Sequence, residues 1–354
     1  MSTGRRPARA VTYESRPARP ADRERWSSFV ADHPEATPFH TWAWQRAVGD
    51  ALGYEPAHRI VTERGTADPV AIVPGFSIPG IAGRTVTNPF CEYGFPLFAE
   101  GVDTVAVLRD LADNLGRLGA RILTDVGWTG ISGYNAAGYG AVRTGNVSRL
   151  DTDRAFDAVR ERSFSGAARR RIRSAAERGV TVRPASVTAY YPLYLATTRR
   201  LGSRQLPRDF FVELADAFGD DLAVFVAEHD GDVLGGILML DFDGTRTIWS
   251  NAFREDAREF HPTYRLYATA VEDACATALA VVDFGRSRPG TGVHDLKRQF
   301  GGTASPLAGF VTPPHRVNRA SPDGGGPMAA LAERLSPAVT NPVVGSRLTR
   351  FSHE

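Results

Sequence analysis

The chain has 354 residues, a mass of 38.4 kDa and a formal net charge of +2, with 42% hydrophobic and 23% charged residues. This length exceeds what one hydrophobic core usually organises and predicts two globular domains with terminal segments. Two cysteines exclude a disulfide framework, and no apolar run is long enough to cross a bilayer. The Arg- and Pro-rich residues 1–20 lack an apolar core, which predicts a disordered arm and a cytoplasmic protein.

Residues 21–150 are expected to form an N-terminal domain in which helices cover a sheet. Apolar residues at helical spacing predict helices over Ala21–Asp32 and Thr41–Leu52. Short strands, a helix, a further strand and a Gly-rich hairpin or crossover should follow. Their expected bounds are Ala57–Glu63, Pro69–Ile78 and Arg84–Asn88 for the strands, Val102–Leu118 for the helix, Arg121–Val126 for the last strand and Gly127–Gly145 for the Gly-rich stretch.

Residues 151–312 are expected to form a second domain, followed by a mostly flexible tail over residues 313–354. A single long helix is predicted over Asp153–Arg178, and the turn His229–Asp232 predicts a β-hairpin. The other expected elements are helices over Ala189–Leu201, Arg208–Phe218, Tyr264–Leu279 and Asp295–Phe300, and strands over Leu222–Glu228, Val233–Phe242, Thr245–Asn251 and Val281–Phe284.

The two halves share a weak pattern. The segment RTVTNPF at Arg84–Phe90 is matched by RTIWSNAF at Arg246–Phe253, each ending a strand that precedes a helix. Such similarity either arises by chance in a β meander or reflects two copies of one fold with a cleft between them. The fold class expected is therefore mixed α/β.

Lysine occurs once, at Lys297, among 42 basic residues. An ammonium on a flexible stem differs from a planar guanidinium in reach, hydration and ability to share a proton, so this position can require those properties. It lies in VVDFGRSRPGTGVHDLKRQFGG, residues 281–302, where a strand ends in a glycine-rich turn. Arg286 and Lys297 can there hold phosphate oxygens or a developing oxyanion. The alternative is a surface turn with solvated charges.

Several enzyme classes are excluded by their missing motifs. The lysine stands between Leu296 and Arg298, so no Walker A loop exists, and neither G-x-S-x-G nor a complete G-x-G-x-x-G after a strand occurs. The eight histidines show no metal-ligand spacing. We therefore expect no metal and no resident cofactor.

The DFGRS run and the Lys297 element that follows it resemble the Fem family, which comprises aminoacyl-tRNA-dependent peptidyltransferases and FemAB-like relatives. Four further segments resemble family blocks in the expected order: FHTWAW at 39–44, NPFCEYG at 88–94, SGAARRRIRSAAERGVTV at 165–182 and YYPLYLATTRRLGSRQLPRDFF at 190–211. The resemblance covers about residues 26–307. It implies two tandem GNAT-like domains, with mixed sheets flanked by helices and a cleft between them. The long helical arm of some cell-wall members has no counterpart here.

The resemblance implies transfer of an amino acid from aminoacyl-tRNA, as co-substrate, to an amine of a small-molecule or peptidyl acceptor. The acceptor that the resemblance implies is a natural-product intermediate or a peptidoglycan precursor. Because an aminoacyl ester is already activated, aminolysis needs positioning and oxyanion stabilisation but no covalent intermediate. Lys297 matches the family's catalytic lysine, and Arg204 matches an arginine that grips acceptor phosphate. The remaining substrate-binding candidates are Arg46, Glu92, Tyr93, Tyr264, Arg286 and Leu296. For Arg46 and Glu92 the alternatives are a solvated charge and a structural loop anchor.

Residues 160–183 carry eight arginines against two glutamates. On a helix, Arg169, Arg170 and Arg173 point outward and can follow an RNA backbone, because phosphate contacts need charge and reach. A solvated helix face is the alternative.

Two other functions remain open. A GNAT-type acyl-CoA-dependent N-acyltransferase is suggested by QFGGTA at residues 299–304, which fits a pyrophosphate-binding pattern but follows an expected helix instead of preceding one. A non-catalytic tRNA-binding module is supported by the arginine run alone.

Overall fold

The computed structural model describes residues 12–80, 83–115, 118–127, 131–203 and 205–316. Within them, helices flank one long mixed sheet and one small antiparallel sheet, as expected for the α/β class. The first half contains β1 (Tyr13–Pro17), η1 (Pro20–Asp22), α1 (Arg23–Ala31), η2 (Pro38–His40), α2 (Trp42–Leu52), β2 (Glu55–Pro56), β3 (Arg59–Glu63), β4 (Pro69–Val73), β5 (Phe76–Gly80), β6 (Gly83–Thr87), β7 (Leu97–Phe98), α3 (Thr104–Leu115), β8 (Gly119–Asp125), α4 (Ile131–Ala136) and β9 (Gly140–Asp151).

The second half continues with α5 (Phe156–Ser163), α6 (Gly166–Glu177), β10 (Thr181–Pro184), α7 (Val187–Arg200), α8 (Arg208–Phe218), η3 (Gly219–Asp221), β11 (Leu222–His229), β12 (Asp232–Phe242), β13 (Thr245–Phe253), η4 (Glu255–Phe260), α9 (Pro262–Ala276), β14 (Val281–Ser287), α10 (Gly292–Gln299), β15 (Thr303–Thr312) and η5 (Pro314–Arg316). No helix in the described ranges has both the length and the apolarity to cross a membrane.

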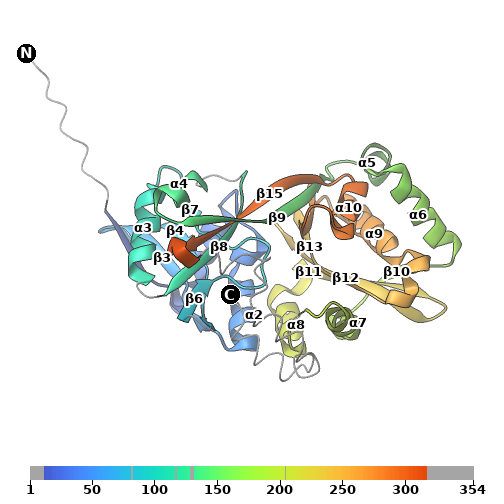
Figure 1. The fold of residues 1–354 in the computed structure, drawn as a ribbon, viewed down its shortest axis with the longest axis horizontal. Helices are drawn as coiled ribbons and strands as arrows, with labels where there is room; N and C mark the ends of the chain where they lie inside the picture. The colour runs from blue at the N-terminus through green and yellow to red at the C-terminus, as the bar shows by residue number, and fades with distance from the viewer. Residues whose placement is uncertain (1–11, 81–82, 116–117, 128–130, 204, 317–354) are drawn as a thin grey trace, which may run out of the picture.

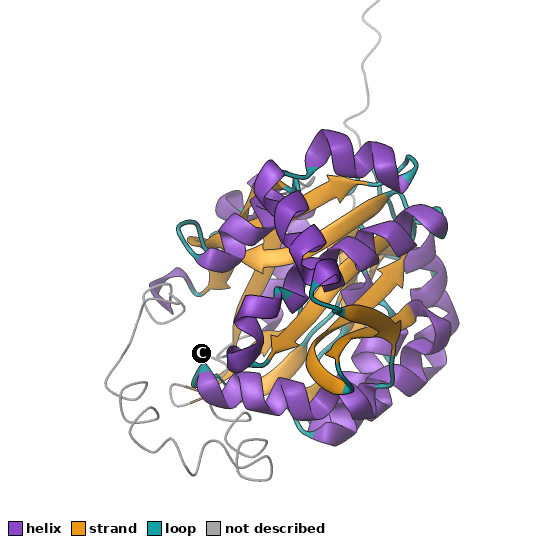
Figure 2. Cartoon of the chain, turned by 90° about the vertical axis from the view of Figure 1, so that its right-hand side faces the viewer, coloured by secondary structure: helices purple, strands orange, loops and turns teal. Residues whose placement is uncertain are grey.

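One long sheet joins the two halves. Its strand order is β10-β11-β12-β13-β14-β9-β15-β8-β6-β5-β2, and a smaller sheet has the order β1-β3-β4-β7. Strands β9 and β15 reach across the middle of the molecule (Figure 1), where β15 pairs with β8 on one side and β9 on the other. Viewed from the side of the second half, helices pack around the strands (Figure 2). The chain segment expected to close the second domain therefore completes the sheet of the first.

Aromatic side chains fill the contact between the halves. The ring of Trp44 on α2 lies 6.1 Å from that of Phe210 on α8 and 5.7 Å from that of Trp249 on β13. Trp249 also donates its indole N–H to the carbonyl oxygen of Phe90, at 2.8 Å. Burial of such large rings stabilises the relative position of the halves.

Three sequence expectations for the first half need correction. Tyr13–Pro17 is strand β1, paired with β3, so the arm predicted over residues 1–20 is wrong for these residues. The strand predicted over Pro69–Ile78 is divided at Pro74, because proline has no N–H to donate to a ladder. The Gly-rich stretch holds helix α4 and the start of β9. Residues 1–11 and 317–354, the rest of the predicted arm and most of the predicted tail, lie outside the described residues.

The helix predicted over Asp153–Arg178 is broken into α5 and α6. Phe164 has extended backbone, and Ser165 starts α6 by accepting a hydrogen bond from the amide of Ala168 at 3.1 Å. The ring of Phe164 packs 4.8 Å from that of Phe300, directly after α10. At the break, the ring of Phe164 is thus buried in the core of the second half.

Candidate active site

The candidate site lies where β14 bends after Asp283. β13 and β14 pair in parallel only over Thr245–Thr247 and Val281–Asp283, and the register between β14 and β9 shifts between Asp283 and Arg286. Gly285, within this shift, has a φ of 71°, a backbone conformation that residues other than glycine rarely adopt. The bend turns the carbonyl groups of Gly285 and Arg286 out of the regular ladder and toward α10.

Lys297 on α10 fills the space beneath this bend. Its side chain is 2% exposed, and Nζ donates hydrogen bonds to the carbonyl oxygens of Gly285 at 2.9 Å and Arg286 at 2.7 Å. An ammonium has three N–H groups, and these two bonds occupy two of them. Burial lowers the pKa of Lys297 to about 8, although the negative charges of Glu92 and Asp283 oppose this shift.

Glu92 brings the first half to the same point. Its carboxylate accepts a hydrogen bond from the backbone N–H of Arg286 at 2.9 Å, and its side chain is 15% exposed. The Arg286 Nε atom lies 3.7 Å from the same carboxylate, while the arginine itself is exposed. A carboxylate, a guanidinium and a buried ammonium thus meet at the end of β14.

A buried network supports this arrangement from below. The Tyr93 hydroxyl donates to the Asp283 carboxylate at 2.5 Å, and the Gly285 N–H donates to its other oxygen at 2.7 Å. Arg149 bridges Asp283, at 3.1 Å, and Asp125, at 2.7 Å. Burial raises the pKa of Asp283, with Arg149 opposing the shift, and burial together with the charge of Asp283 raises the pKa of Tyr93 well above its ordinary value.

The structure thus brings together four of the residues singled out from the sequence: Lys297, Glu92, Tyr93 and Arg286. Asp283 anchors the turn, while Arg149 and Asp125 were missed. Arg149 lies on β9, which pairs with β14 and β15, and Asp125 lies on β8, which pairs with β15. Only this assembly of strands brings both residues to Asp283. No group of three His, Cys, Asp or Glu side chains suited to a metal ion occurs among the residues that the structure describes.

The other candidates lie elsewhere. Tyr264 on α9 donates its hydroxyl to Gln299 at 3.1 Å and accepts a hydrogen bond from Arg171 on α6. Leu296 packs partly buried against the hydrophobic core of the second half, and Arg46 is exposed on α2. Arg204 lies outside the described residues.

The α6 arginines divide into two groups. Arg170 and Arg173 are exposed, as the helical spacing predicted. Arg169, also exposed, directs Nη1 at the carbonyl oxygens of Glu161, at 3.0 Å, and Phe164, at 2.9 Å, so it closes the C-terminal end of α5. Its guanidinium is therefore partly engaged within the protein.

The segment with the pyrophosphate-binding pattern leads from a helix into a strand. α10 ends at Gln299, and β15 begins at Thr303. The amides of Gly301 and Gly302 donate to the carbonyl oxygens of Arg298 and Lys297, both at 3.0 Å. A Cβ atom at Gly301 would lie 2.6 Å from the backbone oxygen of Ser163. These amides close α10 and face packed protein.

Comparison with known proteins agrees with this architecture. Residues 162–298 match the family model described as an acetyltransferase (GNAT) domain. The structure of FemX superposes with a TM-score of 0.63 at 14% identity, covering 83% of this chain and 96% of the other. L-PGS from Bacillus licheniformis gives a TM-score of 0.52 at 12% identity, covering 90% and 97%.

A tandem GNAT protein from the clavulanic acid biosynthesis pathway gives a TM-score of 0.52 at 14% identity, covering 85% of this chain and 98% of the other. No curated protein sequence matches the chain significantly. At these identities the likenesses concern the fold. They confirm the resemblance to Fem- and GNAT-like proteins at that level.

Proposed function

Because the chain has a GNAT-type acyltransferase fold, we propose that it moves an aminoacyl group from aminoacyl-tRNA to an amine of a small-molecule or peptidyl acceptor. The acceptor amine attacks the ester carbonyl, a C–N bond forms, and the ester C–O bond to the terminal ribose breaks. The amine loses a proton, and the ribose oxygen gains one. No redox step or covalent enzyme intermediate is needed.

The observation that carries the proposal is the position of Lys297. Its Nζ is held by two carbonyl groups, which leaves one N–H for an oxygen of the substrate. A cation fixed in a site of low exposure stabilises negative charge that develops on the carbonyl oxygen more strongly than a solvated one does. Glu92, at the edge of the same site, is placed to orient the acceptor's ammonium before it loses its proton.

The donor assignment is supported by the likeness to FemX and by the α6 surface. Arg170 and Arg173 are exposed and make no hydrogen bond or ion pair within the described part of the chain. α6 packs against α9, on the same half of the molecule as Lys297 (Figure 1). A positively charged helix face can hold the phosphates of a nucleic-acid donor while the aminoacyl end of that donor reaches Lys297. The acceptor would be a natural-product intermediate or a peptidoglycan precursor, and the reaction cytoplasmic.

A second candidate is an acyl-CoA-dependent N-acyltransferase, favoured by the match of residues 162–298 to the GNAT domain model. The engaged amides of Gly301 and Gly302 argue against a pyrophosphate site in that segment. Purified protein should be given labelled aminoacyl-tRNA or labelled acetyl-CoA with the same set of amines.

Product from the first donor that disappears after ribonuclease treatment supports the proposal. Product from acetyl-CoA alone would establish the second candidate. Tight tRNA binding without product from either donor would instead indicate a non-catalytic binding module.

A further inference from the structure

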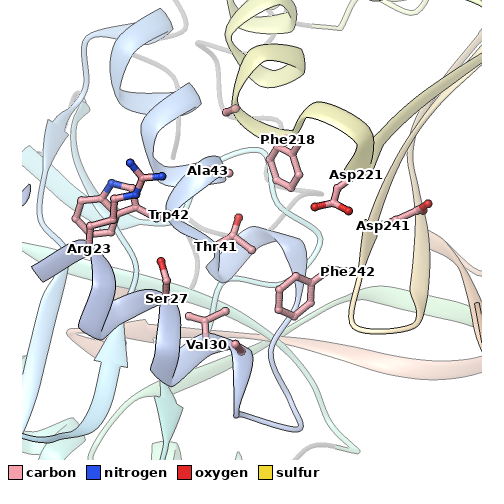
Figure 3. A pocket seen from close by; sticks show the side chains of 12 residues that line it. Arg23, Ser27, Val30, Thr41, Trp42, Ala43, Phe218, Asp221, Asp241 and Phe242 are labelled. Atoms are coloured by element: carbon pink, nitrogen blue, oxygen red, sulfur yellow. The ribbon is translucent and has the colours of Figure 1, made fainter.

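A cavity lies between the halves, away from Lys297. It has a volume of about 250 Å³ and is lined by α1 and α2 on one side and by the end of α8, η3 and the end of β12 on the other. None of Lys297, Glu92, Tyr93, Arg286 or Asp283 lines it. Its apolar wall consists of Val30, Trp42, Phe218 and Phe242 (Figure 3).

Two side chains of opposite charge line this cavity from opposite halves. Figure 3 shows Arg23 of the first half on the side opposite Asp221 of the second, with the Asp221 carboxylate directed toward Thr41. Both side chains belong to exposed residues, and neither forms a hydrogen bond or ion pair with any residue that the structure describes. Two unpaired charges separated by an apolar surface are a pattern that a ligand can complete.

Two further carboxylates, those of Asp241 and Asp220, lie near Asp221. Partial burial raises the pKa of Asp221, and the neighbouring carboxylates of Asp241 and Asp220 contribute to the shift. Asp241 itself is held by Arg246, whose Nε and Nη2 lie 2.9 and 2.7 Å from its two oxygens. Asp221 is thus the carboxylate left to receive a cation.

We propose that this cavity binds a small zwitterion with an apolar body, of dipeptide size, whose ammonium pairs with Asp221 and whose carboxylate pairs with Arg23. The volume accommodates a molecule of this size, and the rings of Trp42, Phe218 and Phe242 offer contact for its apolar part. Because Arg23 and Asp221 come from different halves, the bound ligand would hold the halves together. This role is separate from acyl transfer.

The test is isothermal titration calorimetry with three probes: L-alanyl-L-phenylalanine, its N-acetyl derivative and its C-terminal amide. The free dipeptide should bind about fivefold more tightly than either blocked form, since each removes one ion pair of roughly 1 kcal/mol at a partly exposed site. Asp221→Asn should remove the preference over the N-acetyl form only. Arg23→Gln should remove the preference over the amide only.

Asp220→Asn is the matched control, because it removes a neighbouring charge that does not line the cavity. It should leave both preferences in place. Thermal melting of each variant without ligand checks that the fold is intact. Absence of saturable dipeptide binding, equal binding of all three probes, or preferences that persist in Asp221→Asn and Arg23→Gln would each overturn the proposal. None of these readouts depends on the aminoacyl-transfer reaction.

Discussion

The Nζ atom of Lys297 lies 2.7 Å from the carbonyl oxygen of Arg286, so the ammonium of the chain's one lysine is bound to the strand end that forms the candidate site. The hydrogen bonds of Nζ connect β14 and α10, and they fix the position of the ammonium, whereas the side chain of a surface lysine moves freely in solvent. Its position and its protonation state become two separately testable properties.

The pH profile of transfer should report the charge of this lysine. Burial lowers its pKa from 10.5 to about 8, so the ammonium form dominates below that pH and is lost above it. If the charged form stabilises the oxyanion, kcat/KM should fall as the pH rises through about 8.

Ionisation of the acceptor amine acts with the opposite sign, because the neutral amine is the nucleophile. The Lys297→Gln variant separates the two effects: its residual activity should lack the alkaline decrease. A wild-type rate that rises through about pH 8 with a step that Lys297→Gln removes would mean that neutral Lys297 acts as a base.

The buried network beneath the site should be important for stability. Asp283→Ala leaves Arg149 short of one carboxylate and Tyr93 without its acceptor, which should lower the free energy of unfolding by about 3 kcal/mol. Tyr93→Phe removes one hydrogen bond and should cost about 1 kcal/mol.

Urea denaturation measures both losses. Asp295→Ala on the exposed surface of α10 is the matched control, with an expected change within about 0.5 kcal/mol. An Asp283→Ala protein as stable as this control would contradict the assigned role of the network.

The two exposed arginines of α6 should affect RNA affinity without affecting the fold. Replacing Arg170 and Arg173 by alanine should weaken tRNA binding and lower the slope of log K against log salt by about two, one for each phosphate contact. Fluorescence anisotropy over a salt series measures this slope.

Arg169→Ala should behave differently, because Arg169 caps α5 and its loss should lower the melting temperature. Arg64→Ala, in the turn directly after β3 of the first half, controls for a general loss of positive charge and should leave the slope unchanged (Figure 1). A double variant with the wild-type slope would show that α6 is a solvated face.

Local sequence patterns predicted most helices and strands, because apolar spacing and turn residues act within a few positions. The hairpin between β11 and β12 and the helix Arg208–Phe218 are confirmed. β15 escaped prediction because its pairing with β8 and β9 depends on residues more than 150 positions away. The break at Phe164 was missed because the contact of its ring with Phe300 joins residues far apart in the sequence.

The same distinction applies to the site. Lys297 and Arg286 could be found from the sequence because Lys297 is the only lysine and both residues lie in one short glycine-rich segment after a predicted strand. Glu92 and Tyr93 were found through the family resemblance. Arg149 and Asp125 could not be found, since an arginine among 41 and an aspartate at a strand end become distinctive only once β8, β9 and β14 are assembled.

The most direct measurement is single-turnover amide formation from labelled aminoacyl-tRNA by Lys297→Arg, with the exposed neighbour Arg298→Lys as control. A guanidinium keeps the charge but cannot place one N–H where the buried ammonium holds it. The Lys297→Arg rate should fall by about a hundredfold, with tRNA affinity retained and Arg298→Lys near wild type. Full turnover by Lys297→Arg would contradict the proposed role of the ammonium.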